Sequence, residues 1–416
     1  MTTAPSGEET RWAAWCGWVL VGVSALSVLA GYLGPLAFAP VAALGGLLTL
    51  PALRVPSAHR WTAAGLLAVL IWAVGSVVWS PYQPKDLEGA TAVKLLAQTP
   101  IYAALVCAAG LAAARPRQVA LRILAWGVAG LGLVLTLEAM TGAAGYYALR
   151  EAIGDPTRPD LAARNVAQGG FVLAILAPAA TLAAWRVEAR PWLAVPMVTG
   201  LVGLALAFGY DALLIALLAG VLAAAATVRW PKGAPRLMGA GVALYIAAAP
   251  AIVHAVRAGG WYAALESQVP LSWSMRMSYW CHAVDWIGDH PLRGWGLDAS
   301  RMFSPGIELH PHNAALQIWL ELGLVGALGA ALFWGALLAG FAREKADAGT
   351  AAGAATACVY LVFSAVSFGV WQDWWLALGA VGAAVCLAVQ RQPALARRKA
   401  AARQALRPST PAVFSE

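Results

Sequence analysis

The strongest constraint on this fold is a succession of apolar runs, each long enough to cross a lipid bilayer. A helix rises 1.5 Å per residue, so about 20 apolar residues span a hydrocarbon core of about 30 Å. Such runs lie at residues 13–33, 35–53, 61–79, 92–113, 119–141, 165–185, 191–209, 211–228, 237–256, 314–341, 350–370 and 374–390. The sequence therefore predicts an all-α integral membrane protein of about twelve transmembrane helices, with residues 1–416 forming a single polytopic domain.

Composition supports this class and excludes a water-soluble enzyme. Of 416 residues, 61% are hydrophobic and only 12% are charged, and the mean hydropathy is +0.68. All cysteines except Cys281 lie inside apolar runs, and no CxxC spacing indicates a metal or disulfide framework. Glu8 and Glu9 stand where a cleavable signal peptide would carry basic residues, so the first apolar run is expected to remain as a span.

The distribution of Lys and Arg predicts the orientation. Most of the 28 basic residues fall in alternate connections and in the tail at 391–416, which places both termini in the cytoplasm. The net charge of +8 is thus a topology signal, and no nucleic-acid partner is expected. The tail is expected to be a basic cytoplasmic appendage that is attracted to membrane lipids. The connections expected outside the cytoplasm are 80–91, 142–164 and the long periplasmic loop 257–313.

A histidine-containing turn directly precedes the apolar run at 314–341. Pro311 disfavours helical geometry in His310, and Asn313 can accept a hydrogen bond from a free amide, so the helix should begin at about Asn313. His312 would then lie at the positive end of that helix, where an anion is favoured and an imidazolium is disfavoured. A neutral His312 could act as a general base, and Asn313 would lie at the helix start, where an anion such as a phosphate binds.

A polar stripe continues into this helix. Asn313, Gln317 and Glu321 are four residues apart, and Glu321 lies roughly 12 Å below the helix start. A carboxylate at that depth should face other helices or a wet cavity. Close helix packing is also favoured by the glycines that follow, Gly323, Gly326 and Gly329. A capped helix with a purely structural glutamate fits the same residues, and both interpretations stay open.

The long loop should contain an amphipathic helix from Ser274 to Asp289. Its apolar face comprises Trp280, Ala283, Val284 and Ile287, and its polar face Ser278, His282, Asp285 and Asp289. Arg276 falls on the apolar face and needs an anionic partner. That partner is either a phosphate or the carboxylate of Asp285 or Glu266, which would form a salt bridge with Arg276.

Three further groups of residues could bind an ion or cap a helix. Arg164 and Asn165 open the run at 165–185, where the free amides of a helix start form another anion site. Asp211 is expected to cap the following helix. His282, Asp285, Asp289 and His290 have a generic spacing that a solvated polar face explains as well as a metal does, and no metal is predicted.

Several of these residues together resemble a known family. Arg276 and Trp280, then Pro291, Gly294 and Gly296, then His312-Asn313, and finally Gly323-Leu324-Val325-Gly326 resemble the conserved region of O-antigen ligases and Wzy-type polymerases. The number of spans and the long external loop are similar as well. The resemblance implies a GT-C-type membrane glycosyltransferase that moves a glycan from undecaprenyl diphosphate to an acceptor hydroxyl at the periplasmic face of the bacterial inner membrane.

The resemblance also assigns roles to residues. It implies that His312 is the essential histidine and that Arg276 binds the diphosphate, with Asn165 matching an asparagine near the start of the sixth span. His310, Gln317 and Glu321 are expected to support this site. One position departs from the family, because Tyr210-Asp211 stands where a Ser-Arg pair is usual. Either Arg164, Arg293 or Arg301 substitutes for the missing arginine, or the donor is held differently, or activity is altered.

Physical chemistry favours the same kind of reaction. Nucleotide sugars and ATP are scarce outside the cytoplasm, so a lipid diphosphate that carries its own leaving group is a suitable donor, and no metal or cofactor is required. O-antigen ligase, with lipid A core as acceptor, is the leading hypothesis. Alternatives within the family are a polymerase, whose acceptor is a growing glycan, and a protein O-oligosaccharyltransferase. An alternative of another class is a transporter or flippase of an anionic lipid-linked substrate, which would depend on Glu138 and Glu321.

Overall fold

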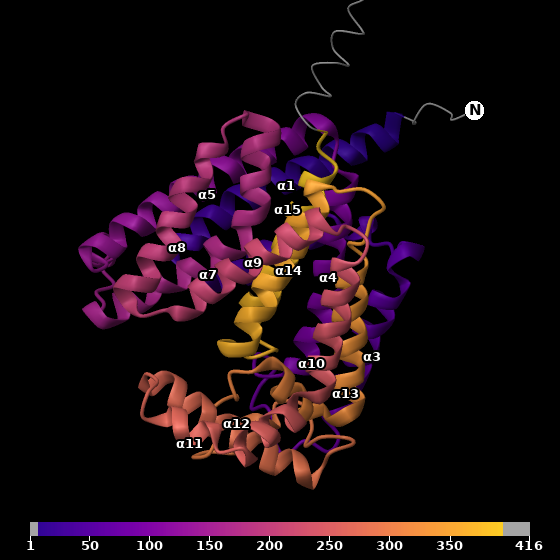
Figure 1. Ribbon diagram of the computed structural model, residues 1–416. Coiled ribbons are helices and arrows are strands. Elements are labelled where there is room, and N and C mark those ends of the chain that lie inside the picture. The colour runs from indigo at the N-terminus through magenta and orange to yellow at the C-terminus, as the bar shows by residue number, and fades with distance from the viewer. Residues whose placement is uncertain (1–6, 394–416) are drawn as a thin grey trace, which may run out of the picture.

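A computed structural model describes residues 7–393, and the regular secondary structure in this part of the chain is helical, without strands (Figure 1). The α-helices are α1 Gly7–Leu33, α2 Phe38–Leu47, α3 Arg60–Ser76, α4 Thr91–Leu111, α5 Ala114–Thr141, α6 Ala144–Ala152, α7 Pro159–Ala183, α8 Ala194–Phe208, α9 Asp211–Arg229, α10 Ala234–Ala258, α11 Trp261–Glu266, α12 Leu271–Asp289, α13 Ala314–Ala339, α14 Ala348–Val366 and α15 Asp373–Gln390. Short turns of other helix types are η1 Pro35–Ala37, η2 Leu50–Ala52, η3 Ser57–His59, η4 Ala184–Glu188, η5 Pro191–Leu193 and η6 Ala299–Met302. Most of the expected basic tail, residues 394–416, lies outside the described residues.

Within residues 7–393, 11 helices are long and apolar enough to cross a membrane. The multi-pass, all-α prediction is therefore confirmed, although the run at 35–53 forms only the short helix α2 between η1 and η2. At 1.5 Å per residue, the 10 residues of α2 extend about 15 Å, which is half of a hydrocarbon core. Pro35 opens η1 and Pro51 lies inside η2, so the α-helix is interrupted at both ends of the run.

The helices pack in two groups. The larger core gathers residues from α1, α2, α4, α5, α7, α8, α9, α14 and α15. The smaller core is formed by α3, α10, α12 and α13 together with the chain that precedes α13. Trp334 and Leu376 contact both cores and so join the two groups. The histidine-containing turn belongs to the smaller group.

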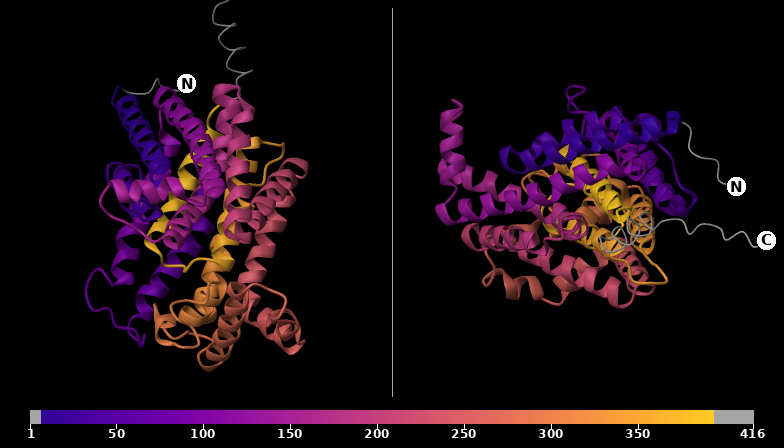
Figure 2. Two further views of the ribbon diagram at one scale, coloured as in Figure 1. Left: turned by 90° about the vertical axis from the view of Figure 1, so that its left-hand side faces the viewer. Right: turned by 90° about the horizontal axis from the view of Figure 1, so that it is seen from above.

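The chain between α10 and α13 lies at one end of the molecule. It carries α11 and α12, and it is opposite the end where α1 begins and α15 finishes (Figure 2). The expected amphipathic helix is part of α12. Ala283 and Ile287 of its apolar face are buried, whereas the four polar-face residues named above are exposed. This segment therefore presents one face to the bundle and the other to its surroundings.

Helix α13 is interrupted at Gly323, where φ is 64° and ψ is −161°. The interruption frees backbone groups, and the loop after α12 occupies them. The amides of Trp295 and Gly296 donate to the carbonyls of Leu320 and Glu321 at 2.9 and 2.7 Å. In the other direction, the amide of Leu324 donates to the carbonyl of Pro291 at 2.8 Å. Gly323 thus opens the helix to a loop, a role different from the close helix packing expected of it.

Only glycine fits at the centre of this junction. A Cβ on Gly294 would lie 2.3 Å from the Glu321 carbonyl oxygen, and one on Gly323 would lie 2.4 Å from that of Leu292. Both residues also have positive φ, which side chains disfavour. The backbone geometry of the junction therefore requires glycine at 294 and 323, which the spacing of the glycines in the sequence did not reveal.

We expect Gly294→Ala to lower the free energy of unfolding by about 2–3 kcal/mol, because it adds a backbone clash to a strained φ. Thermal unfolding of the purified protein in detergent measures this change. Gly288→Ala is the matched control, since a Cβ at this helical position meets nothing within 4 Å. Equal unfolding midpoints for the two variants would contradict the proposed junction.

Candidate functional site

The site begins with the backbone of the His-Pro-His-Asn turn. Asn313 is the N-cap of α13, and its Oδ1 accepts a hydrogen bond from the Leu316 amide at 3.1 Å, as predicted. Its Nδ2 donates to the Tyr245 hydroxyl of α10 at 3.0 Å. His312 has a left-handed φ of 54°, which is unusual for a residue with a side chain. The cap and this strained residue fix where the imidazole points.

The imidazole of His312 is held in one tautomer. Its Nδ1 lies 2.7 Å from the Ser367 carbonyl oxygen, in the connection between α14 and α15. Because a carbonyl oxygen can only accept, Nδ1 carries the proton and Nε2 of the neutral ring holds the lone pair. Nε2 has no hydrogen-bond partner within residues 7–393. This arrangement is that of a general base with a free basic nitrogen.

Burial keeps both histidines neutral. Desolvation lowers the pKa of His312, and the nearby charge of Arg276 lowers it further, although the Ser367 hydrogen bond opposes these effects. Desolvation also lowers the pKa of His310 to about 3, with smaller effects from His312 and Arg301. The Nδ1 of His310 accepts the His312 amide at 3.2 Å, which requires a neutral ring. His310 therefore acts on the site as a buried hydrogen-bond acceptor.

Helix α12 packs against this turn through aromatic residues. Trp280 donates from Nε1 to the Pro311 carbonyl at 2.9 Å. The Tyr279 ring stacks on the His312 imidazole, with ring centroids 6.1 Å apart and an interplanar angle of 15°. Arg276 lies one turn earlier on the same helix. One helix outside the long spans thus positions an aromatic wall and a cation beside the histidine.

Arg276 has no carboxylate partner among the described residues. Asp285, one candidate for a salt bridge, instead pairs with Arg257 at 2.6 Å. Arg276 donates from Nη1 to the Ser272 carbonyl at 2.7 Å and lies over the Trp273 ring at 5.5 Å. Its Nε is buried without any hydrogen-bond partner. A half-buried guanidinium with unused donors is suited to an anionic ligand.

Arg164 and Asn165 lie on α7, but their local setting differs from the prediction. Helix α7 begins at Pro159, so Arg164 and Asn165 are in its second turn and not at the free amides of its start. The predicted helix start was wrong because hydropathy marks only the apolar run, whereas the helix begins earlier, at Pro159, and includes polar residues before that run. Burial raises the pKa of Tyr210, while the charges of Arg164 and Arg276 oppose the rise.

The other two candidate arginines are engaged elsewhere. Arg301 donates from Nε to Asp298 Oδ1 at 3.0 Å and lies over the Tyr82 ring. Arg293 lies over the Trp79 ring at 5.9 Å. Arg164 is exposed and has no ion pair in the described part of the chain. Asp211 is the first residue of α9, whose N-cap is Tyr210, so Asp211 does not cap the helix as expected.

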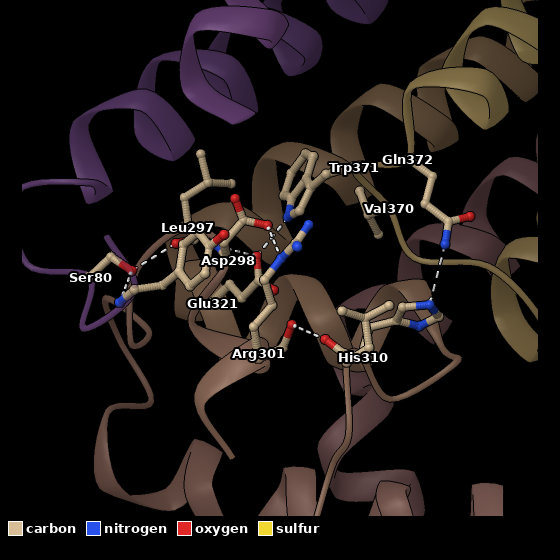
Figure 3. A network of polar contacts seen from close by, with 12 residues as sticks. Ser80, Leu297, Asp298, Arg301, His310, Glu321, Val370, Trp371 and Gln372 are labelled. Atoms are coloured by element: carbon tan, nitrogen blue, oxygen red, sulfur yellow. Dashed lines mark hydrogen bonds and ion pairs between the residues drawn. The ribbon is translucent and has the colours of Figure 1, made fainter. Parts of the chain in front are cut away.

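Glu321 is the centre of a buried network (Figure 3). Its Oε2 accepts the Asp298 amide at 3.0 Å and Trp371 Nε1 at 2.6 Å, and its Oε1 accepts Gln317 Nε2 at 3.0 Å. Gln317 Oε1 in turn accepts the Val370 amide at 3.0 Å. The stripe that begins at Asn313 thus ties α13 to the loop after α12 and to the chain before α15, which includes the connection that holds His312.

The remaining polar groups are occupied separately. His282 Nδ1 lies 2.9 Å from the Ser278 carbonyl oxygen, and the His290 ring packs edge-on against Trp295. No group of three or more His, Cys, Asp or Glu side chains suited to a metal ion occurs in the part of the chain that the structure describes. The buried Glu138 accepts the Tyr32 hydroxyl at 2.6 Å and the Gly145 amide at 3.2 Å.

Comparison with known proteins bears on this geometry. A family model described as O-antigen ligase matches residues 166–331, which include Arg276, His312 and Glu321. This stretch is similar to the O-antigen ligase family. The similarity runs from within α7 to within α13, whereas Ser367 lies beyond it.

Two relatives in Rickettsia carry the provisional description of polysaccharide ligase. The protein of Rickettsia prowazekii is 30% identical over 122 residues, and that of Rickettsia conorii is 27% identical over 118 residues. Each alignment covers 25% of this chain and 29% of the relative. The similarity is therefore regional, and it concerns less than a third of either relative.

Sequence reasoning missed several groups in the site. The Ser367 carbonyl has no side-chain signature, and Tyr279 was not distinguished from its aromatic neighbours. Asp298 and Trp371 contact Glu321 from segments far away in sequence. The only signal was the polar and aromatic interruption around 371–374 between two apolar runs.

The neutral His310 predicts that stability falls in acid. Its folded-state pKa, about 3, is below the usual value of 6.5, so the unfolded chain binds an extra proton between these pH values. We expect His310 to contribute a loss of at most about 1.4 kcal/mol per pH unit as pH falls from 6.5 towards 3.

Thermal unfolding in detergent at several pH values measures this slope. His310→Asn is the test variant, because its amide oxygen can replace the acceptor for the His312 amide without titrating. A variant whose stability fell with acid as steeply as that of wild type would contradict this role of His310.

Proposed function

We propose that this protein is an O-antigen ligase, which transfers a glycan from undecaprenyl diphosphate to a hydroxyl of lipid A core. The observation that carries the proposal is His312, whose Nδ1 is fixed by the Ser367 carbonyl and whose Nε2 has no hydrogen-bond partner among the described residues. Arg276, a cation without a carboxylate partner, lies near it. A base and an unpaired guanidinium are the two groups that transfer from a lipid diphosphate requires.

The proposed reaction is a single displacement at the anomeric carbon of the donor. The acceptor hydroxyl gives its proton to His312 Nε2 while its oxygen forms the new glycosidic bond. The bond between the anomeric carbon and the diphosphate oxygen breaks, and undecaprenyl diphosphate leaves with that electron pair. His312 afterwards releases its proton to solvent or to the departing diphosphate. The scheme uses no cofactor.

The diphosphate is assigned to Arg276 and Arg164. The charges of both guanidinium groups act on the Tyr210 hydroxyl, where they oppose the rise in pKa that burial causes, and this supports a shared anion site. Arg164 would thereby replace the arginine that the family usually has at the position of Asp211. Asn313 uses its side chain for the helix cap and Tyr245. We therefore assign Asn313 to positioning His312, and not to direct diphosphate binding.

The proposed location is the bacterial inner membrane, with both termini in the cytoplasm and the site facing the periplasm. Both termini can lie on one side of 11 long helices because the short α2 also returns the chain to the end where α1 begins, where Trp15 Nε1 donates to the Leu48 carbonyl at 2.8 Å. The site lies at the opposite end of the bundle from the start of α1 and the finish of α15 (Figure 2). Basic residues that include Arg186, Lys232 and Arg343 flank spans at that other end. This asymmetry supports the proposed orientation.

We expect His312→Ala to abolish transfer while leaving membrane insertion intact, because it removes the base but no buried charge. The measurement is a gel of surface polysaccharide and lipid-linked glycans from cells that lack the protein, complemented with wild type or His312→Ala. For a ligase, long chains accumulate on undecaprenyl diphosphate, disappear from lipid A core and return only with wild type.

Other patterns on the same gel identify other functions. Accumulation of single repeat units would show a polymerase, and loss of glycan from proteins would show a protein O-oligosaccharyltransferase. Full complementation by His312→Ala would exclude His312 as the base.

Replacing Arg276 should change transfer activity without changing the stability of the protein. Since it has no carboxylate partner, Arg276→Met should leave the unfolding midpoint in detergent nearly unchanged. Transfer should fall by about 100-fold or more, the effect of removing one group that stabilises developing charge. Arg257→Met is the matched control, because this arginine on α10 pairs with Asp285 and has no assigned role in transfer. Normal transfer by Arg276→Met would remove the diphosphate assignment.

A further inference from the structure

A cavity of about 190 Å³ lies next to the residue that contacts His310, and no residue of α12 lines it. Its walls come from the segment before α4, from η6 and from the start of α15. Gln372 lines this cavity, and its Nε2 lies 3.4 Å from His310 Nε2 (Figure 3). His310 in turn accepts the His312 amide. The cavity thus lies two side chains from the proposed base, and the proposed transfer scheme does not use it.

The lining of this cavity has the chemistry that recognises a sugar ring. Each sugar hydroxyl both donates and accepts hydrogen bonds, and the cavity offers both kinds of partner. Glu88 and Asp373 supply carboxylates, Thr91 supplies a hydroxyl, and Trp371 supplies an indole ring. A carboxylate can accept from two neighbouring hydroxyls, and an indole can pack against an apolar sugar face. The volume is suited to one sugar residue.

Several groups in the lining have unused hydrogen-bonding capacity. The Oε1 of Gln372 is buried without a partner. Arg301 uses Nε for Asp298, while its Nη groups make no hydrogen bond within the described residues. Lys94 and Asp373 pair at 2.8 Å, and each is about one third exposed. The charges are therefore largely balanced inside the protein, which favours a neutral polyhydroxylated ligand over a lone anion.

A second cavity, of about 350 Å³, adjoins the first and shares Gln372 and Asp373 with it. Its other walls are apolar and comprise Leu36, Ala39 and Trp374. Leu36 is 73% exposed and precedes α2, among helices whose exposed apolar surface would face lipid. A polar cavity that continues into an apolar one open towards lipid fits an amphiphile that has a sugar at one end.

We propose that these two cavities bind the acceptor, with its terminal core sugar at Glu88 and Thr91 and part of its lipid-anchored body along Leu36. This inference rests on the proposed ligase function, and it adds the place where the second substrate binds. Donor and acceptor would approach His312 from different sides, the donor along α12 and the acceptor along the start of α15. The acceptor class is a lipid-anchored saccharide.

The test measures equilibrium binding to the purified full-length protein in detergent. The probe is rough lipopolysaccharide, which is lipid A that carries core sugars without O-antigen. The parent protein carries His312→Ala, so that binding is measured without turnover. Glu88→Ala and Thr91→Val are added to it separately. Lys85→Ala is the matched control, because Lys85 lies on the same loop but does not line the cavity.

We expect Glu88→Ala to weaken binding of rough lipopolysaccharide by about tenfold, the loss of one hydrogen bond to a charged group. Thr91→Val should weaken it by less, and Lys85→Ala should leave it unchanged. Binding of lipid A that lacks core sugars should be equal in the parent and in all three variants, because the altered groups contact sugar.

The proposal would be overturned if rough lipopolysaccharide did not bind, or if it bound equally to the parent and all three variants. It would also be overturned if Glu88→Ala weakened binding of lipid A without core sugars as much as binding of rough lipopolysaccharide. A loss of binding seen only with undecaprenyl-diphosphate-linked glycan would overturn it as well. The gel pattern of complemented cells decides the ligase function separately, so failure of one proposal can be distinguished from failure of the other.

Discussion

The interruption of α13 at Gly323 is the feature on which the site depends. A continuous helix would keep the carbonyls of Leu320 and Glu321 within its own hydrogen bonds, and the loop after α12 would have no place to attach. The interruption provides acceptors for Trp295 and Gly296 and donors for Pro291 and Leu292. Unpaired backbone groups in a membrane interior are costly, so each side of this junction satisfies the other. The loop that holds Asp298 and the turn that holds His312 are fixed as a result.

Glu321 completes the same assembly at the side-chain level. It accepts hydrogen bonds from three groups that lie on the loop after α12, on α13 itself and on the chain before α15. The last of these segments leads back to Ser367, the partner of His312. A buried carboxylate far from the proposed reaction therefore helps to hold the tautomer of the base. The three hydrogen bonds that Glu321 accepts explain how a carboxylate is tolerated in an apolar setting, so its burial does not require a role in proton transfer.

The sequence predicted the parts of this protein that depend on local physics. Long apolar runs gave the spans, and Pro311 with Asn313 gave the start of α13, because proline geometry and helix capping act within a few residues. The start of α7 was missed, since a helix can continue into polar residues that hydropathy does not mark. The Ser367 carbonyl and the Asp298 amide were out of reach, because backbone groups have no residue identity and their partners are brought in by tertiary packing. The resemblance supplied the proposed role of His312, and the fold supplied the hydrogen bond of its imidazole.

The position of Ser367 has a consequence for comparing relatives. The family similarity ends at residue 331, yet the group that fixes the ring of His312 lies 36 residues further on, at the end of α14. A chain could keep every motif of the matched segment and still lose the competent ring orientation through a change in the connection between its last two helices. Classifying such relatives as active or inactive therefore calls for inspecting that connection, whose important atom is a backbone oxygen that sequence identity does not score.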